Sequence, residues 1–195
     1  MKPGIGFLRG AAFSRLTAAL LVLQLAACAQ WERVGVDNAR FEAGKHDYVL
    51  TQPIGWVRHT AGADELFLTR DGPALNFIVA SRQPHDRKLP ATKRETRADM
   101  LPIDLAELAI AEWKSSAETE NLEVVSNEPA WVGGKPAARL HVRWKNERGL
   151  PIDRLVYALV DARGRFSLIY QAPAIVYFER GLPAFEGMVQ SLQFQ

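Results

Sequence analysis

The chain has 195 residues, of which 24 are Lys or Arg and 22 are Asp or Glu, so its formal net charge is +2. Lys2, Arg9 and Arg15 carry three of the positive charges in an amino-terminal segment without acidic residues, and residues 28–195 have a net charge of −1. Modules that bind nucleic acid usually have a strongly basic face, so this balance argues against nucleic acid as a partner. A single cysteine excludes an intramolecular disulfide.

The first 27 residues have the order of a secretory signal: basic residues, then an uncharged leucine-rich run over residues 16–27, then the small residues Ala26 and Ala27. A membrane-spanning helix needs about 20 consecutive apolar residues. This run is shorter and contains Gln24. We therefore expect residues 1–27 to be removed as a signal peptide.

The sequence Leu25-Ala26-Ala27-Cys28 resembles the lipobox of bacterial lipoproteins. The resemblance implies that Leu25, Ala26 and Ala27 are recognised by the signal peptidase. It also implies that Cys28 is the lipidation site, where it receives a diacylglycerol and an amide-linked acyl group such as palmitate. Two or more acyl chains anchor a protein firmly, because each buried methylene contributes about 0.8 kcal/mol. The alternative for Cys28 is an ordinary buried thiol.

Ala29 follows the cysteine, at the position where Asp tends to retain lipoproteins in the inner membrane. We therefore expect the protein in the outer membrane, with its domain facing the periplasm. Residues 28–45 mix charges with glycines and lack periodicity, which predicts a tether. The remaining residues, 46–195, are long enough for one domain.

The first half of this domain is predicted to be mainly strands. Residues 48–51 form a strand, and the apolar runs over residues 65–70 and 74–81 are joined by Asp71-Gly72-Pro73, which predicts a hairpin. Residues 82–97 are polar and basic, and we expect a loop there.

Residues 102–118 are predicted to form a helix that packs broadly on a core. Leu105 and Leu108 widen a face whose members fall at helical spacing: Ile103, Ala106, Ile110, Trp113 and Ala117.

The second half is predicted to alternate strands and turns and to end in a helix. A strand over residues 122–126 precedes a turn over residues 131–136, and further strands cover residues 154–160 and 165–170. The clearest alternation is in residues 139–145: Leu140, Val142 and Trp144 face the core, and Arg139, His141, Arg143 and Lys145 form a basic outer face.

The closing helix has apolar residues at helical spacing, with Pro183 expected in its first turn. These residues are Phe178, Leu182, Phe185, Val189 and Leu192. Strand runs flanked by an internal and a terminal helix indicate the α+β class.

Four segments between Tyr48 and Phe194 resemble the PsbP-like superfamily. They are Pro53-Ile54-Gly55-Trp56, Leu66-Phe67-Leu68-Thr69-Arg70-Asp71-Gly72, Val132-Gly133-Gly134-Lys135-Pro136-Ala137-Ala138-Arg139-Leu140, and Phe185-Glu186-Gly187-Met188-Val189-Gln190-Ser191-Leu192. The resemblance implies a central antiparallel sheet with helices on both faces, an α/β/α sandwich. The superfamily includes photosystem subunits and a nuclear-transport factor, so it implies no residue role.

No catalytic, metal-binding or cofactor-binding residues are predicted. The histidines, His46, His59, His85 and His141, lack helical metal-pair spacing. His85-Asp86 is the only local pair of a histidine with a carboxylate, and its alternative is a solvated loop. Gly133-Gly134-Lys135 lacks the glycine spacing and the Ser or Thr of a phosphate-binding loop.

Two groups of cations are candidates for binding anions. Arg87, Lys88, Lys93 and Arg94, flanked by Arg82 and Arg97, would attract anionic lipid headgroups or lipopolysaccharide phosphates. The basic face of residues 139–145 is the second group. The alternative for both is ordinary solvated charge.

The tryptophans Trp56, Trp113, Trp131 and Trp144 either line a ligand pocket or belong to the core. We expect Trp113 and Trp144 to be packing residues. The main hypothesis is a non-enzymatic envelope lipoprotein that binds or scaffolds an envelope protein or an anionic lipid through its sheet face or basic loop. Carriage of a small apolar or lipidic ligand between sheet and helix is the alternative, and an enzyme is the third hypothesis.

Overall fold

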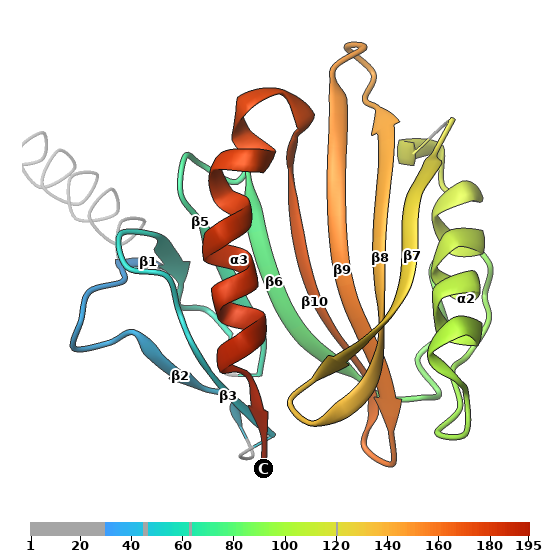
Figure 1. Cartoon of the computed structure of the whole chain (residues 1–195), viewed down its shortest axis with the longest axis horizontal. Helices are drawn as coiled ribbons and strands as arrows, with labels where there is room; N and C mark the ends of the chain where they lie inside the picture. Colours follow the sequence, from blue (N-terminus) through green and yellow to red (C-terminus); the bar gives the residue numbers. More distant parts are fainter. Residues whose placement is uncertain (1–29, 45–46, 63, 120) are drawn as a thin grey trace, which may run out of the picture.

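The computed structural model describes residues 30–44, 47–62, 64–119 and 121–195. Eight antiparallel strands form the main sheet in the order β1-β4-β5-β6-β10-β9-β8-β7, and a smaller sheet has the order β11-β3-β2 (Figure 1). The main-sheet strands are β1 (Trp31–Arg33), β4 (Val57–His59), β5 (Leu66–Thr69), β6 (Phe77–Gln83), β7 (Glu123–Val132), β8 (Lys135–Lys145), β9 (Pro151–Asp161) and β10 (Gly164–Pro173). The remaining elements are β2 (Arg40–Glu42), β3 (Tyr48–Thr51), β11 (Gln193–Phe194), α2 (Pro102–Lys114), η3 (Ala117–Thr119), η4 (Ala174–Phe178) and α3 (Glu179–Ser191).

The predicted α+β class, with helices on both faces of an antiparallel sheet, is confirmed. In β10, Phe166, Leu168 and Tyr170 belong to the core cluster beneath α3. Ile169 points the opposite way and belongs to the cluster beneath α2. Because successive strand residues point to opposite faces, the two helices lie on opposite faces of the sheet.

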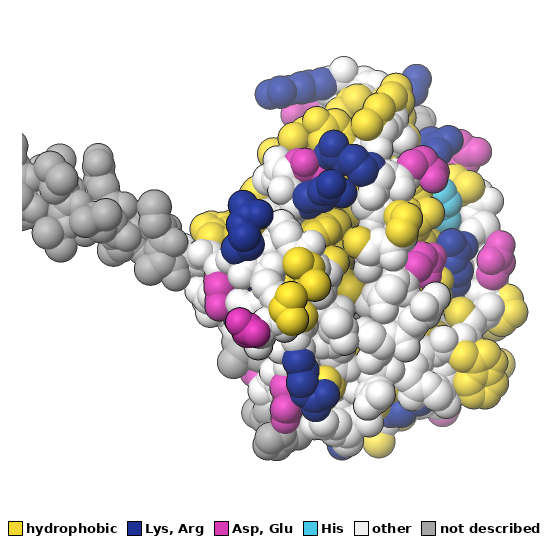
Figure 2. Space-filling view, turned by 60° about the vertical axis from the view of Figure 1, so that its left-hand side comes forward, with side chains coloured by type: hydrophobic (Ala, Val, Ile, Leu, Met, Phe, Trp, Pro, Cys, Tyr) yellow, Lys and Arg dark blue, Asp and Glu magenta, His cyan; other side chains and the backbone are white. Residues whose placement is uncertain are grey.

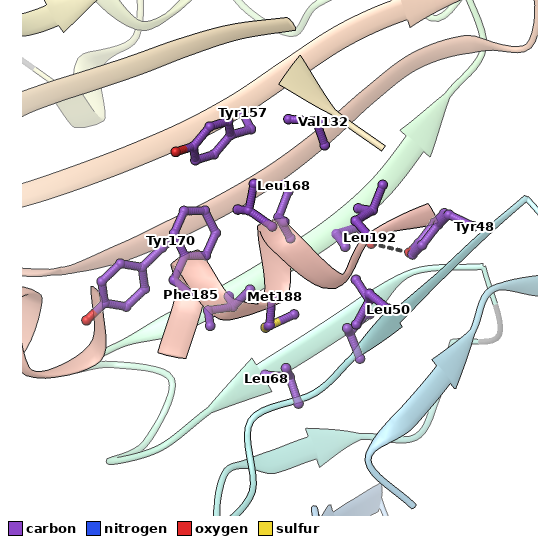
Figure 3. Close-up of a cluster of buried hydrophobic side chains, with 14 of the residues drawn as sticks. Tyr48, Leu50, Leu68, Val132, Tyr157, Leu168, Tyr170, Phe185, Met188 and Leu192 are labelled. Carbon is purple, nitrogen blue, oxygen red and sulfur yellow. Dashed lines mark hydrogen bonds between the residues drawn. The ribbon is translucent and has the colours of Figure 1, made fainter. Parts of the chain in front are cut away.

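The larger core lies between α3 and the sheet. Phe185 and Met188 of α3 are essentially fully buried and pack with Leu168 and Tyr170 (Figure 3). Tyr48 of β3 is also fully buried, and its hydroxyl group donates a hydrogen bond to the carbonyl oxygen of Ala80, 2.9 Å away. This bond fastens the small sheet to β6 of the main sheet.

Most of the predicted tether over residues 28–45 is part of the folded domain. Strand β1 pairs with β4, and β2 pairs with β3. Val34, Phe41 and Ala43 are buried in the main core. The prediction of a tether is therefore wrong for residues 31–43, and the domain begins well before residue 46. Very short strands separated by a turn gave this segment no periodicity.

The predicted hairpin, the predicted turn over residues 131–136 and the strand alternation agree with the structure. Strands β5 and β6 pair across the turn that contains Asp71 and Gly72. Strands β7 and β8 are joined at Gly133 and Gly134, which both have positive φ angles. In β8, the predicted core residues Leu140, Val142 and Trp144 are buried.

Strand β7 is longer than predicted and forms one edge of the main sheet. A β-bulge interrupts its register between Val124 and Ser126. Pro129 has no backbone N–H to offer, and the charged residues Glu123 and Glu128 are exposed. These features make the edge a poor template for a further strand.

The two long helices differ from the prediction in detail. α2 ends at Lys114, and Ile103, predicted to face the core, is 50% exposed. The rest of the predicted face agrees with the structure, because Leu105, Ala106 and Leu108 are buried and Ile110 and Trp113 pack against the core. Ala117 is exposed, and the buried Glu112 was not predicted. Pro183 lies inside α3 rather than in its first turn, because the irregular segment η4 precedes the helix.

Candidate functional site

Helix α2 covers only part of its face of the sheet. It packs on β7, β8 and β9, and Figure 1 shows it at the β7 side of the sheet, away from β5 and β1. At the edge of α2 and beyond it, the same face carries hydrophobic and aromatic side chains that are half-buried or exposed. We call these residues the open sheet face: Trp31, His59, Phe67, Phe77, Val79 and Ile169.

The strand register places most of these residues in one row. Trp31 pairs with His59, and His59 pairs with Phe67. Phe67 pairs with Val79, and Val79 pairs with Ile169. Side chains on directly opposed residues are close neighbours, so the row is continuous from β1 to β10.

Ring contacts hold the β1 end of this row together. The ring of Trp31 packs edge-on against His59, with centroids 4.8 Å apart, and against Phe67 at 6.1 Å. Phe67 stacks on Phe77 at 5.7 Å. Trp31 nevertheless remains 37% exposed. These rings border a hollow of about 410 Å³ lined by Trp31, His59, Ala61, Gly62, Glu65, Phe67 and Pro73.

A second, smaller hollow of about 140 Å³ lies at the other end of the row, between α2 and the sheet. Leu105, Leu108 and Trp113 line its helix side. Its sheet side includes Ile169, which is also the last member of the open sheet face, and Arg165. The open sheet face therefore connects two hollows.

Arg165 is the main charged group on the sheet side of the smaller hollow. Its guanidinium makes no hydrogen bond or ion pair with any residue in the described part of the chain. Burial lowers the pKa of Arg165, the nearby carboxylate of Glu112 raises it, and the positive charge of Arg87 lowers it, with a net lowering. An anion beside Arg165 would oppose this shift.

Glu112, on the helix side of the same hollow, already has partners. Its carboxylate accepts hydrogen bonds from the backbone N–H groups of Ala91 (2.6 Å) and Thr92 (2.8 Å) and from the hydroxyl of Thr92 (2.8 Å). Burial raises the pKa of Glu112, but these bonds outweigh it and lower the pKa below its ordinary value. Glu112 therefore ties the loop before α2 to the helix.

The predicted basic loop keeps its exposed cations, with one exception. Arg87 donates to the side chain of Gln83 (2.7 Å), and Lys88 lies 4.0 Å from Glu95. Lys93 and Arg94 are exposed. Arg82 differs, because its largely buried side chain forms ion pairs with Asp47 and Asp161.

The basic residues predicted on the outer face of β8 do not form a free cationic surface, because two of the arginines are paired. That part of the prediction is wrong. Arg143 forms two hydrogen bonds, of 2.6 and 2.7 Å, to the buried carboxylate of Asp153. Arg139 contacts Tyr157 and Glu186. The sequence placed these cations correctly but gave no sign of the acidic partners on β9 and α3. Figure 2 shows Lys and Arg side chains interspersed with Asp, Glu and hydrophobic side chains on one face of the molecule.

The histidines do not gather into a site among the described residues. His85 contacts the hydroxyl of Thr96 and the carbonyl oxygen of Asp161, and His141 stacks on Phe178 with ring centroids 5.1 Å apart. Within the described ranges, no group of three His, Cys, Asp or Glu could hold a metal ion.

The tryptophans divide between core and surface. Trp56 and Trp144 are buried, whereas Trp131 is 73% exposed. Trp113 packs against the guanidinium of Arg154, which is 5.1 Å from its ring. Sequence reasoning missed Trp31, because it assigned this residue to a tether. The unbroken apolar run around Phe67 was an available signal, because alternation fails when both faces of a strand are apolar.

The predicted lipidation site Cys28 and the recognition residues Leu25, Ala26 and Ala27 lie outside the described residues, as does His46. None of the helices that the structure describes combines the length and hydrophobicity needed to cross a membrane.

No family model matches the sequence, and no curated protein matches it. Among solved structures, the chain is similar to cyanobacterial PsbP (CyanoP) from Synechocystis sp. PCC 6803, with a TM-score of 0.54 and 17% identity over 84% of this chain and 98% of that one. The Saccharomyces cerevisiae Ran-binding protein Mog1p gives a TM-score of 0.53 and 8% identity over 80% of this chain and 94% of that one.

A crystal structure from Bacteroides thetaiotaomicron also matches, with a TM-score of 0.47 and 12% identity over 80% of this chain. The matched region is 48% of that protein, so the chain spans about half its length. At these identities, likeness shows the fold alone. The chain has the PsbP-like fold that its sequence motifs predicted.

Proposed function

We propose that this chain is a lipid-anchored protein of the bacterial envelope and a non-catalytic module that binds another envelope component on its open sheet face. The observation that supports this most directly is the apolar row that continues past the edge of α2. Contiguous exposed apolar surface is characteristic of interaction sites. Burying it would contribute about 25 cal/mol per Å².

The position of the lipid anchor supports the same proposal. Cys28 precedes Trp31 by three residues, a distance of at most about 11 Å along an extended chain. Lipidation would therefore hold the Trp31 end of the open sheet face close to the membrane surface. With Ala29 next to the cysteine, the membrane would be the outer one and the domain would face the periplasm.

Replacement of Cys28 tests the anchor. Cys28→Ser removes the sulfur that accepts the lipid, so fatty-acid label should disappear from the protein and the precursor should stay uncut by the lipoprotein peptidase. In the wild-type membrane form, mass analysis should find Cys28 as the first residue, with added acyl mass. A wild-type protein that is unacylated and free in the periplasm would contradict the anchor.

Photo-crosslinking in intact cells tests the binding surface. A photoreactive amino acid replaces Val79, in the middle of the open sheet face, and in a matched control replaces Trp131, which is exposed on edge strand β7. We expect adducts of defined mass at position 79 and none of the same mass at position 131. Identical patterns at both positions would show that the open sheet face has no specific occupant.

A second candidate function is carriage of a small apolar or lipidic ligand. The hollow between α2 and the sheet favours it, because its lining is largely aliphatic. Native mass spectrometry of residues 28–195 carrying Cys28→Ser should then show a co-purifying molecule. A protein that is always free of ligand, alongside specific crosslinks at position 79, would favour fixed binding over carriage.

A further inference from the structure

The open sheet face forms one continuous apolar path between the two hollows. Ile169 lines the smaller hollow, and Phe67 and Trp31 line the larger one. Val79 bridges them, because it is the register partner of both Ile169 and Phe67. The path crosses five neighbouring strands: β10, β6, β5, β4 and β1. With about 4.8 Å between strands, the row is roughly 19 Å long, and Arg165 lies four residues from Ile169 along β10, roughly 13 Å away.

The two ends of this path differ in charge. At the α2 end, Arg165 has no ion-pair partner among the described residues, and Arg87 is near enough for its charge to act on Arg165. The carboxylate of Glu112 also lines this hollow and acts on Arg165, but its oxygens accept hydrogen bonds from Ala91 and Thr92. Arg87 is hydrogen-bonded to Gln83, the register partner of Arg165. The β1 end is aromatic, with Glu65 as an acidic lining residue of its hollow.

A path with one side chain per strand, apolar on every strand except β4, which contributes the ring of His59, suits a single extended hydrocarbon chain. We propose that the open sheet face binds one long-chain fatty acid, with its carboxylate beside Arg165 and Arg87 and its methyl end beside Trp31. This rests on the proposed function, because it names the component that occupies the same face. Ser167, also in the smaller hollow, offers a hydroxyl donor to the carboxylate.

The charges favour this occupant over others. A cationic amphiphile would meet the positive charges of Arg165 and Arg87. A fatty acid in the opposite orientation would place its carboxylate beside Glu65. A diacyl phospholipid would bring a second hydrocarbon chain, for which the row provides no second path. Charge complementarity therefore selects both the class of ligand and its direction.

Quenching of tryptophan fluorescence tests the orientation. The protein is residues 28–195 with Cys28→Ser, and the probes are two long-chain fatty acids, one brominated near its methyl end and one near its carboxylate. Bromine quenches tryptophans that it contacts. The first probe should quench Trp31, and the second should quench Trp113 in the smaller hollow. Trp31→Phe should abolish the first effect only, and Trp113→Phe the second only.

The contribution of the cation is tested by Arg165→Gln, with Arg148→Gln in an exposed loop as the matched control. Loss of one charge-assisted hydrogen bond should weaken binding of the fatty acid about tenfold or more. A trimethylammonium amphiphile with the same hydrocarbon chain should bind the wild type much more weakly. Arg148→Gln should leave both values unchanged. Arg87→Gln should weaken fatty-acid binding as well, which covers the case of an Arg165 variant that does not fold.

Absence of fatty-acid binding, equal binding of the cationic amphiphile, or equal quenching by both probes would each overturn the proposal. A diacyl phospholipid or a lysophospholipid that competes more strongly than the fatty acid would overturn the choice of ligand. If fatty-acid binding fails while specific crosslinks at position 79 persist, the binding function of the face stands and its occupant is different. If both fail, the proposed function fails as well.

Discussion

The hydroxyl group of Tyr170 on β10 lies directly against Gly181 of α3, where a Cβ atom would overlap it. The hydroxyl donates a hydrogen bond to the carbonyl oxygen of Tyr177, 2.7 Å away, and the carbonyl oxygen of Phe178 lies within acceptor distance at 3.1 Å. The glycine therefore lets α3 approach the sheet closely enough for Tyr170 to hold the end of η4.

Gly181→Ala should lower the free energy of unfolding by about 1 to 3 kcal/mol, because overpacking forces the helix or the tyrosine to move. Gly187→Ala is the matched control in the same helix. A Cβ there meets nothing within 4 Å, and Ala is favoured over Gly in helices by about 0.5 to 1 kcal/mol. Relative to the wild type, the midpoint of denaturant unfolding should be lower for Gly181→Ala and higher for Gly187→Ala. Equal midpoints would show that Gly181 is not required by the contact.

Trp144→Ala should lower the free energy of unfolding by about 3 to 5 kcal/mol, because it empties a large volume beneath α2. Trp144 is 5% exposed and packs in the cluster with Leu140 and Val142. Trp131→Ala, at a residue that is 73% exposed, should change the unfolding free energy by less than about 0.5 kcal/mol. Similar losses for both variants would contradict the assigned faces.

Val176→Gly should raise the free energy of unfolding by about 1 kcal/mol. Val176 has φ 71° and ψ −52°, a conformation that is costly for a β-branched residue and that glycine adopts freely. Its side chain is 63% exposed, so little packing is lost. Val36 is similarly exposed, and its φ angle is not positive. Val36→Gly should therefore lower the melting temperature, whereas Val176→Gly should raise it. A lower melting temperature for Val176→Gly would contradict the prediction.

The stability of the protein should fall when the pH is lowered through about 6.5. Burial lowers the pKa of His141, the nearby Asp153 raises it, and Arg143 and Arg139 lower it, with a net lowering from 6.5. The unfolded chain then binds a proton at a higher pH than the native protein, so the unfolding free energy decreases as the pH falls below the unfolded pKa.

His141→Phe preserves a ring against Phe178 and removes this titration. The unfolding free energy of the variant should change less between about pH 7.5 and 5.5 than that of the wild type. Carboxylates with lowered pKa values, such as Glu112 and Asp161, lose their contribution only at lower pH. If the unfolding free energy of the variant changes with pH as much as that of the wild type, His141 does not cause the pH dependence.

A chain that begins at residue 46 should be markedly less stable than one that begins at residue 30. The shorter chain loses β1 and β2 and leaves the core without Val34 and Phe41. Chemical unfolding of the two chains, measured in reducing buffer, should show a lower midpoint for the shorter one. Equal midpoints would show that residues 30–45 do not contribute to stability, as expected for a tether.

Long, regular elements were predictable from the sequence, because burial imposes a simple period on them. The alternation of Leu140, Val142 and Trp144 identified a strand and its buried face correctly. The alternation also separated Arg139 and Arg143 from the core, but it contained no information about Asp153 or Glu186, which reach them from other elements. Ion pairing between distant segments was therefore invisible in the sequence.

The candidate site was largely hidden for a different reason. The open sheet face is assembled from single residues on five strands, and its first member, Trp31, belongs to a three-residue strand. Such a strand is too short to show a period. Phe67 and Ile169 were recognisable as strand residues, but only the register and the limited extent of α2 reveal that they belong to one incompletely covered face. Of the predicted basic loop, Arg87 is near enough for its charge to act on Arg165 in the smaller hollow.

The bulge, the proline and the exposed glutamates of β7 matter most if the protein is anchored by lipid. Confinement to a membrane surface would bring identical copies together in two dimensions with their sheets in similar orientation. Under such crowding, an unprotected ten-residue edge would invite sheets of adjacent copies to fuse into a growing ribbon. The irregular edge would let the protein accumulate densely without polymerising.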